Sequence, residues 1–125
     1  NLLKAGFQPV IIEAETFPRY HIGESLTTEC VDALGRLDLV EKLSKLKAPQ
    51  KKGVRIFSKH PKNSFYVGAG DAWQVERATF DGMMLETAVE RGAEHFQGKV
   101  RKLTHDENQW NLEIELPDGK MMDDS

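Results

Sequence analysis

The stretch Gly6–Glu13, with the sequence GFQPVIIE, decides the fold. Residues 1–5 before it favour the end of a helix, because a glycine after apolar helix formers adopts the left-handed conformation that closes a helix. Val10–Ile12 is an uninterrupted run of β-branched residues, which is typical of a parallel strand buried on both faces. Helix, glycine turn and buried strand together predict half of a βαβ unit.

A loop and a long helical pattern follow this strand. Residues 15–25 predict a loop, because Pro18 and Gly23 interrupt regular structure. Apolar residues then recur at spacings of three or four over about residues 26–46, which predicts helix with a break or a new cap midway. Cys30 belongs to this apolar stripe, so we expect it to be packed in the core rather than to act as a nucleophile.

The second half of the chain predicts more sheet than helix. A hairpin, a helix, a strand and an antiparallel meander are predicted at about residues 54–67, 77–91, 94–103 and 110–122. The segment Gly68-Ala69-Gly70 lacks a third glycine and a following helix, so it predicts a turn rather than a phosphate-binding loop.

Composition narrows the possible functions. The net charge of −3 comes from 17 basic and 20 acidic residues without any long run of like charge, so nucleic acid is not an expected partner. No apolar run is long enough to span a membrane, so a membrane is not an expected partner. With one cysteine, no intramolecular disulfide is possible, and the four histidines show no metal-ligand spacing, so we expect no metal and a cytoplasmic location.

Glu13 is the first residue with a candidate binding role. Dinucleotide-binding folds place an acidic residue at the end of their second strand, about 20 residues after a glycine-rich loop, where it binds ribose hydroxyls. Counting back from Glu13 puts that loop upstream of residue 1, so we expect the chain to be an internal piece. The alternative is that Glu13 opens a solvated loop.

Two longer segments carry a family resemblance: residues 17–26, FPRYHIGESL, and residues 73–81, WQVERATFD. Together with Glu13 they resemble the FAD-dependent flavoprotein hydroxylase superfamily, and within it the branch of flavin-dependent halogenases and geranylgeranyl-reductase-like oxidoreductases. The resemblance covers almost the whole chain, since the order of the predicted strands also agrees.

The resemblance implies a set of FAD-binding positions. It implies that Glu13 binds the adenosine ribose, that Arg19 lies near the FAD phosphates or ribityl chain, and that the three residues Gly23, Glu24 and Ser25 pass close to the flavin. Glycine permits close backbone approach, and amides at a helix start attract polar or anionic groups. The alternative for the three residues is an ordinary helix cap.

Three further positions follow from the same resemblance. Arg77 matches a family arginine that supports FAD binding, although on its own it is equally a surface ion-pair partner. Val100 falls in the strand whose backbone contacts adenine in the family. Lys51 matches a lysine with which halogenases carry hypohalous acid towards the substrate. The alternative for Lys51 is that it joins Lys47 and Lys52 in a solvated cluster after a helix, where cations complement the helix dipole.

The expected fold class is α/β, a partial Rossmann-type, glutathione-reductase-like FAD-binding fold with an antiparallel β-meander. Residues 1–125 would form part of one FAD-binding domain, with 47–70 as an excursion into a substrate-domain sheet. The expected function is that of an FAD-dependent oxidoreductase, either monooxygenase- or halogenase-like or alkene-reductase-like, although the piece alone is expected to be inactive. NAD(P)H or a partner reductase would supply electrons, and the substrate would be a small molecule, free or carrier-bound. The alternative is a non-catalytic redox or binding module on the flavin fold.

Overall fold

The computed structural model describes residues 1–57, 59 and 64–124, and these form two compact units. The first unit comprises Asn1–Arg19 and Met84–Ser125, and the second comprises Tyr20–Met83. In chain order the elements are η1 (Leu3–Ala5), β1 (Val10–Glu13), β2 (Ser25–Leu26), α1 (Thr28–Arg36), α2 (Val40–Lys45), β3 (Gln50–Ile56), β4 (Phe65–Gln74), α3 (Arg77–Glu90), β5 (Glu94–Gln97), β6 (Lys99–Asp106), β7 (Gln109–Glu115) and β8 (Met121–Asp124).

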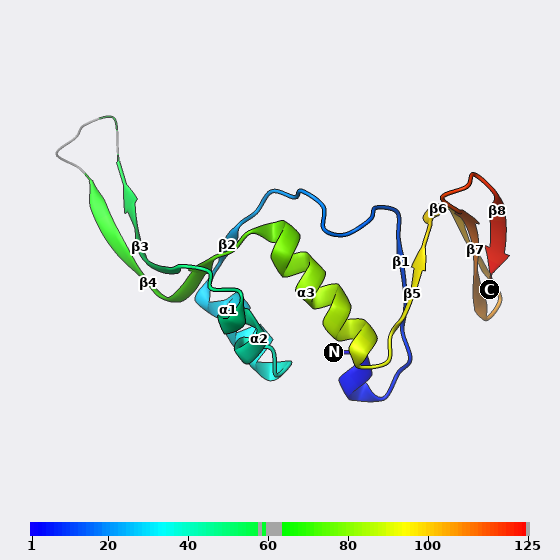
Figure 1. Cartoon of the computed structure of the whole chain (residues 1–125), viewed down its shortest axis with the longest axis horizontal. Coiled ribbons are helices and arrows are strands. Elements are labelled where there is room, and N and C mark those ends of the chain that lie inside the picture. Colours follow the sequence, from blue (N-terminus) through cyan, green and yellow to red (C-terminus); the bar gives the residue numbers. More distant parts are fainter. Residues whose placement is uncertain (58, 60–63, 125) are drawn as a thin grey trace. The chain divides into compact units, whose positions relative to one another are not determined.

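The first unit contains a parallel strand pair and an antiparallel meander (Figure 1). β1 runs parallel to β5, with Val10 opposite Glu94 and Glu13 opposite Gln97. β6, β7 and β8 form a separate antiparallel sheet in that order. The predicted strand at residues 10–13 and the predicted meander are therefore confirmed, and the short helix before them ends as expected at Gly6, which has a φ of 86°.

Two details of the first unit differ from the sequence prediction. β1 is not buried on both faces, because Val10 is 53% exposed and the other residues of the strand are only half-buried in a two-stranded sheet. The strand expected at residues 94–103 is divided at Gly98. The Gly98 amide donates to the Glu13 carbonyl at 2.9 Å, and a Cβ at this position would lie 2.6 Å from Ile114 Cγ2. The close approach of β7 thus requires glycine at the break.

The second unit contains a three-stranded antiparallel sheet, ordered β2-β4-β3, with α1 and α2 (Figure 1). The predicted interruption of the helical pattern is confirmed, because Asp38 lies between the two helices with a φ of 56°. Leu34, Leu39 and Leu43 are all buried, with Leu43 fully so. The predicted hairpin is also confirmed and is longer than expected, since β3 and β4 pair from Ile56–Phe65 back to Gln50–Trp73.

Three expectations for the second unit are wrong. Leu26 lies in β2, so the helix begins only at Thr28. Cys30 is exposed rather than packed in the core; it lies one turn before buried Leu34, with its sulfur 3.6 Å from the Thr27 hydroxyl at the start of the helix. The Gly68–Gly70 segment is part of β4 and not a turn: Gly68 pairs with Gly53, and after a register shift, at which Gly70 has a φ of 54°, Ala72 pairs with Lys51.

α3 begins in the second unit and ends in the first. Its predicted extent of 77–91 is confirmed within one residue, and Gly92 follows with a φ of 103°, the left-handed conformation typical after a helix. Among the described residues, no helix is long and apolar enough to cross a membrane.

Candidate functional site

In the first unit, Glu13 and Arg19 lie close together after β1. One carboxylate oxygen of Glu13 accepts a hydrogen bond from the Glu15 amide at 2.9 Å. The other lies 3.7 Å from Nη2 of Arg19, whose guanidinium also lies over the Phe17 ring, 5.0 Å from its centroid. These contacts curl the chain from residue 13 to residue 19, so the structure brings together the two residues expected to bind the adenosine and phosphate parts of FAD.

The Arg19 side chain has an unsatisfied polar atom. Its Nε is buried and has no hydrogen-bond partner among the described residues, and the Glu15 carboxylate is 3.9 Å away, too far for a hydrogen bond. An unpaired buried donor costs about 1–3 kcal/mol, so such groups are rare in native proteins and require an explanation. An oxygen-rich group placed against Arg19 would supply the missing acceptor, and the phosphate and ribose oxygens of FAD have this chemistry.

A cavity of about 290 Å³ lies within the first unit, next to the Glu13 backbone. Its lining includes Ala14, Gln97 and Leu116. The Glu13 carbonyl accepts two hydrogen bonds here, from the Gly98 amide at 2.9 Å and from Gln97 Nε2 at 3.0 Å, which fixes the end of β1 against the end of β5. Val100, the residue expected at the adenine, lies in β6 opposite Ile114 and is 40% exposed.

In the second unit, Arg77 holds the backbone of the loop before β2. Its Nη1 donates to the carbonyls of Ile22 and Gly23 at 3.0 and 3.2 Å. Its Nε and Nη2 donate to the two carboxylate oxygens of Asp81, one turn further along α3, at 2.8 and 3.0 Å. The hydrogen bonds to Asp81 raise the pKa of Arg77 above its ordinary value. All three guanidinium nitrogens are therefore occupied within the protein.

Gly23 has two reasons to be glycine. Its φ of 103° is unfavourable for residues with a side chain, and a Cβ there would lie 3.0 Å from Nη1 of Arg77. The close approach predicted for Gly23 was that of the flavin, whereas the group that lies against Gly23 in the structure is Arg77 of the same chain. The ion-pair alternative for Arg77 is also observed, through Asp81.

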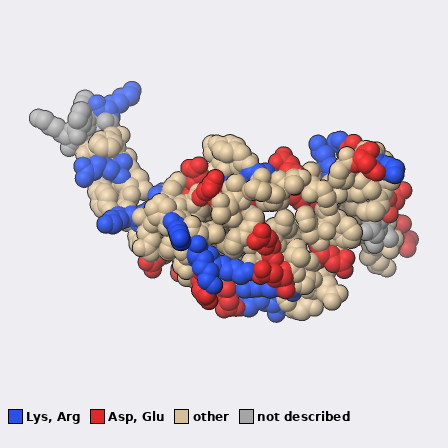
Figure 2. Space-filling view, in the orientation of Figure 1, with Lys and Arg blue, Asp and Glu red and all other residues tan. Residues whose placement is uncertain are grey.

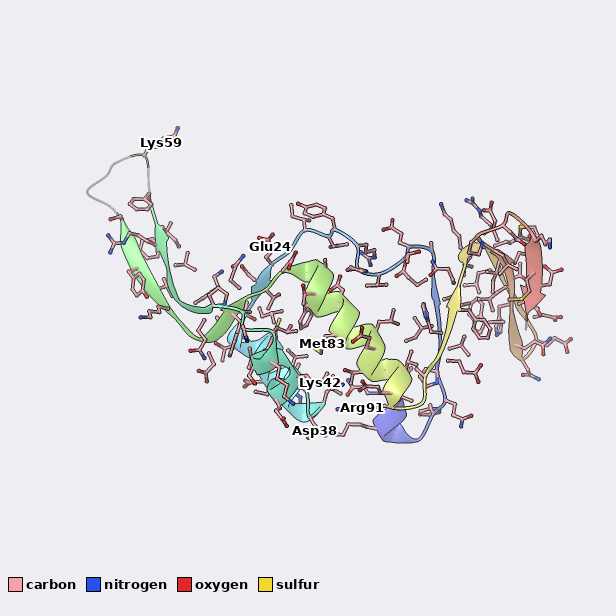
Figure 3. The ribbon with its side chains drawn as sticks, in the orientation of Figure 1. Glu24, Asp38, Lys42, Lys59, Met83 and Arg91 are labelled. Carbon is pink, nitrogen blue, oxygen red and sulfur yellow. The ribbon has the colours of Figure 1, made fainter. Side chains whose placement is uncertain are left out.

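Lys51 lies in β3 and not in a solvated segment after a helix, since α2 ends at Lys45. Its Nζ donates a hydrogen bond to the Ser25 hydroxyl at 2.7 Å. That hydroxyl is 3.4 Å from Oε1 of Gln74, and Nε2 of Gln74 donates to the Glu24 carboxylate at 3.1 Å. Glu24 lies just before β2, in the region where α3 begins (Figure 3).

The structure thus groups the predicted positions into two sets. Glu13, Arg19 and Val100 belong to the first unit, and the remaining positions belong to the second, namely Gly23, Glu24, Ser25, Lys51 and Arg77. Sequence reasoning missed Gln74 and Asp81. Asp81 stands four residues after Arg77, a spacing that indicates a helical ion pair. Gln74 offers no such signal, because its role depends on pairing with Ser25 across β2 and β4.

Comparisons with known proteins point to one family. A 1H-pyrrole-2-carbonyl peptidyl-carrier-protein brominase of Pseudoalteromonas luteoviolacea is 38% identical over 105 residues, which cover 82% of this chain and 26% of that enzyme. A flavin-dependent halogenase of Armillaria mellea is 33% identical over 109 residues, 82% of this chain and 22% of that enzyme. Among solved structures, the flavin-dependent brominase Bmp2 superposes with a TM-score of 0.84 at 33% identity, over 97% of this chain and 30% of that one.

Along most of its length the chain matches one segment of the flavin-dependent halogenases. The resemblance recognised in the sequence is thereby confirmed, as is the mixed α/β fold. No family model matches the chain. The chain spans about a quarter of the length of the curated relatives named above.

Among the described residues there is no group of three or more His, Cys, Asp or Glu side chains arranged to hold a metal ion, and His60 lies outside those residues.

Proposed function

We propose that the protein is an FAD-dependent halogenase, in which Lys51 holds hypohalous acid for transfer to an electron-rich substrate. The observation that carries this proposal is the 2.7 Å hydrogen bond between Lys51 and Ser25. Ser25 belongs to the segment that the family resemblance assigns to the flavin. The hydrogen bond therefore supports a position of the Lys51 ammonium near the flavin. Molecular oxygen would be the oxidant that converts halide to hypohalous acid, and bound FAD, reduced by NAD(P)H or by a partner reductase, would supply the electrons that activate that oxygen.

The residues of the first unit fit the nucleotide half of FAD. The parallel pair β1–β5 supports the Rossmann-type assignment, with Glu13 at the strand end where ribose hydroxyls bind. The buried, unpaired Nε of Arg19 supports a phosphate or ribityl oxygen as its acceptor. Val100 would contribute through its backbone in β6.

The residues of the second unit fit the flavin half. Gly23, Glu24 and Ser25 would approach the ring system through their backbone and through the Ser25 hydroxyl. Arg77 would contribute by fixing the carbonyls of Ile22 and Gly23, since four of its five N–H donors bind these carbonyls and Asp81. We place the enzyme in the cytoplasm, which fits both the single cysteine and the supply of NAD(P)H.

The flavin assignment is tested by titrating the natural protein with FAD. We expect a yellow protein, and an Arg19→Met variant that binds FAD about tenfold more weakly, equivalent to one charge-assisted hydrogen bond of about 1.4 kcal/mol. Arg101→Met is the matched control, because Arg101 pairs with Glu115 on the meander and should leave the affinity unchanged. A natural protein that is colourless and takes up no added FAD would refute the assignment.

Halogenation is tested with reduced FAD, oxygen and bromide or chloride, followed by mass spectrometry of the product. Lys51→Met should abolish the halogenated product while reduced flavin is still reoxidised by oxygen. Lys52→Met is the matched control, because Lys52 is the exposed neighbour of Lys51. This variant should produce as much halogenated product as the natural protein. Undiminished halogenation by Lys51→Met would exclude the role proposed for this lysine.

The β3–β4 hairpin supports a substrate-side role for residues 47–70. Val54, Ile56, Phe65 and Val67 share one face by register and are all 44–57% exposed. An apolar face of this kind is typical of a surface that another part of an enzyme or a substrate covers. Cationic side chains also gather along the hairpin, as Figure 2 shows.

The substrate we propose is an electron-rich small molecule, free or attached to a carrier protein. The carrier-bound form is supported by the relative named for a pyrrole on a peptidyl-carrier protein. Parallel assays with free pyrrole-2-carboxylic acid and with its carrier-protein thioester distinguish the two forms. A product seen only with the thioester selects the carrier-bound substrate.

The hydrogen bond between Lys51 and Ser25 also favours a second candidate function. A lysine whose ammonium is held by a serine of the same chain can be structural, as in a flavoprotein that hydroxylates or reduces its substrate without halide, or in a non-catalytic redox or binding module on the same fold. Substrate turnover that is independent of bromide and unchanged in Lys51→Met would select a hydroxylase or reductase. Flavin uptake without turnover of any kind would select the non-catalytic module.

A further inference from the structure

The Lys51 side chain crosses the central strand β4 to contact Ser25. In the sheet order β2-β4-β3, the lysine belongs to one outer strand and the serine to the other. Lys51 lies opposite Ala72 on the central strand, and Ser25 lies opposite Gln74, two residues further along. Residues opposite each other, and residues two apart in a strand, share a face of the sheet. The four side chains therefore lie on one face, and the small Ala72 side chain leaves room for the lysine stem to cross.

The hydrogen bonds between these side chains all have the same direction. The Lys51 ammonium donates to the Ser25 hydroxyl at 2.7 Å, the hydroxyl donates to Gln74 Oε1 at 3.4 Å, which is the longest of the three bonds, and Gln74 Nε2 donates to the Glu24 carboxylate at 3.1 Å. Aligned hydrogen bonds of this kind polarise and strengthen one another. A cation at one end and an anion at the other fit the direction in which the dipoles between them point.

The Glu24 carboxylate fixes the orientation of the Gln74 amide. A carboxylate only accepts hydrogen bonds, so it selects the NH₂ group of Gln74 and turns the amide oxygen towards Ser25. The Ser25 hydroxyl must then donate to that oxygen, and its lone pairs point to Lys51. Without Gln74, the hydroxyl hydrogen can rotate towards the ammonium, and the lone pairs of Ser25 no longer point to Lys51 in a fixed direction.

We infer that Gln74 is a positioning residue, which holds the Ser25 hydroxyl so that the Lys51 ammonium is fixed over the central strand. This inference rests on the proposed function for what the lysine then does. One of the three N–H donors of Lys51 is used by Ser25, which leaves two for the oxygen of hypohalous acid. A fixed ammonium presents these donors in one direction, whereas a mobile one would release hypohalous acid to solution.

The first arm of the test needs neither flavin nor turnover. Trace acylation of lysines in the natural protein, read by fragment-ion mass spectrometry, gives the reactivity of Lys51 relative to its neighbour Lys52. A lysine held by a charge-assisted hydrogen bond must leave its partner before it is acylated, so we expect Lys51 to react about threefold to tenfold more slowly than Lys52. Gln74→Met and Ser25→Ala should abolish this difference, and Ser25→Thr, which keeps the hydroxyl, should preserve it.

The second arm measures halogenation by the FAD-loaded protein. Gln74→Met should lower kcat about tenfold, leave the KM for the substrate unchanged and increase the hypohalous acid that escapes to a trapping reagent. Gln109→Met is the matched control, because Gln109 is an exposed glutamine of β7. It should change none of these quantities.

The two arms separate this inference from the proposed function. Equal reactivity of Lys51 and Lys52 in the natural protein, or an unchanged ratio in both Gln74→Met and Ser25→Ala, overturns the positioning role. A changed ratio with unchanged halogenation and leakage also overturns it, since the hydrogen bonds would then serve only stability. A natural protein that never halogenates refutes the proposed function, and the acylation ratios still decide whether Gln74 fixes Lys51. If Gln74→Met does not fold, Gln74→Glu, whose carboxylate cannot donate to Glu24, replaces it in both arms.

Discussion

Replacing Arg77 with alanine should destabilise the protein by about 2–3 kcal/mol. The side chain makes two hydrogen bonds to Asp81 and two to loop carbonyls, and the Arg77 and Asp81 side chains are only 24% and 13% exposed. A hydrogen bond to a charged group contributes about 1.5–3 kcal/mol, and an exposed ion pair about 0–1 kcal/mol. Because both side chains are partly exposed, the expected loss of stability is well below the combined contribution of four buried hydrogen bonds to a charged group. With a urea dependence of about 1–3 kcal/mol per molar, the unfolding midpoint should fall by roughly 1 M.

Arg101→Ala is the matched control for this loss. Arg101 also pairs with a carboxylate, that of Glu115, but its side chain is 48% exposed on the meander. Its removal should therefore cost less than about 1 kcal/mol. Arg77→Lys should behave almost like alanine, because an ammonium lacks the planar fork that serves Asp81 and the two carbonyls at once.

A local measurement shows whether the loss arises at the loop. Arg77 ties down the carbonyls of Ile22 and Gly23, so its removal should free the segment that follows Arg19. Limited trypsin digestion should then cleave after Arg19 several-fold faster in Arg77→Ala than in Arg101→Ala, under conditions where both variants are folded. If Arg77→Ala is as stable as Arg101→Ala and is cleaved no faster, the structural role given to Arg77 is wrong.

Three further predictions concern glycines and one helix. Gly53→Ala should destabilise the hairpin by about 1–3 kcal/mol, measured by urea unfolding, because a Cβ there collides with the Tyr66 ring. Its control is Gly68→Ala on the paired strand, which should cost far less because a Cβ there meets nothing within 4 Å. Gly82→Ala should stabilise the protein by about 0.5–1 kcal/mol, because Gly82 lies inside α3 with open space around it; a loss of stability there would contradict the geometry. The hydrogen bond and charge of Lys45 lower the pKa of Glu41. The pair therefore stabilises α2 fully at a pH above the pKa of a free glutamate. This stabilisation is lost as the pH falls through the lowered pKa of Glu41. Carboxyl NMR titration should show the Glu41 pKa rising in Lys45→Ala.

The elements with a strong local signal were predictable from the sequence. α3, the hairpin and the meander follow from apolar period and turn residues, and all three are present. The failures concern features set by residues distant in sequence. Gly68–Gly70 indicated a turn, yet it lies in β4, where the pairing with β3 shifts register and Gly70 adopts a φ of 54° without ending the strand. Cys30 matched the apolar period of α1 but lies near the start of that helix, beside the Thr27 hydroxyl, where it is exposed.

The candidate site was predictable only in part, for the same physical reason. Glu13 was proposed from the acidic end of β1, and residues 23–25 were proposed from the family resemblance, both without knowledge of their neighbours. What each side chain contacts depends on strand pairing. Nothing near Gln74 in the sequence indicates that it lies between Ser25 and Glu24, and nothing near Arg77 indicates that two of its acceptors are carbonyls more than 50 residues earlier.

The two sequence segments that carry the family resemblance form one structural unit. The Val75 amide donates to the Glu24 carbonyl at 2.7 Å, Gln74 contacts Ser25 and Glu24 by side chain, and Arg77 donates to the carbonyls before them. The second segment therefore sets the backbone and side-chain conformation of the first. Gly23 must lack a side chain because Arg77 lies against it, and Lys51 has a fixed partner because Gln74 holds Ser25. The presence of both sequence segments in one chain is evidence that they contact each other. Either segment alone would lack the groups that determine its conformation.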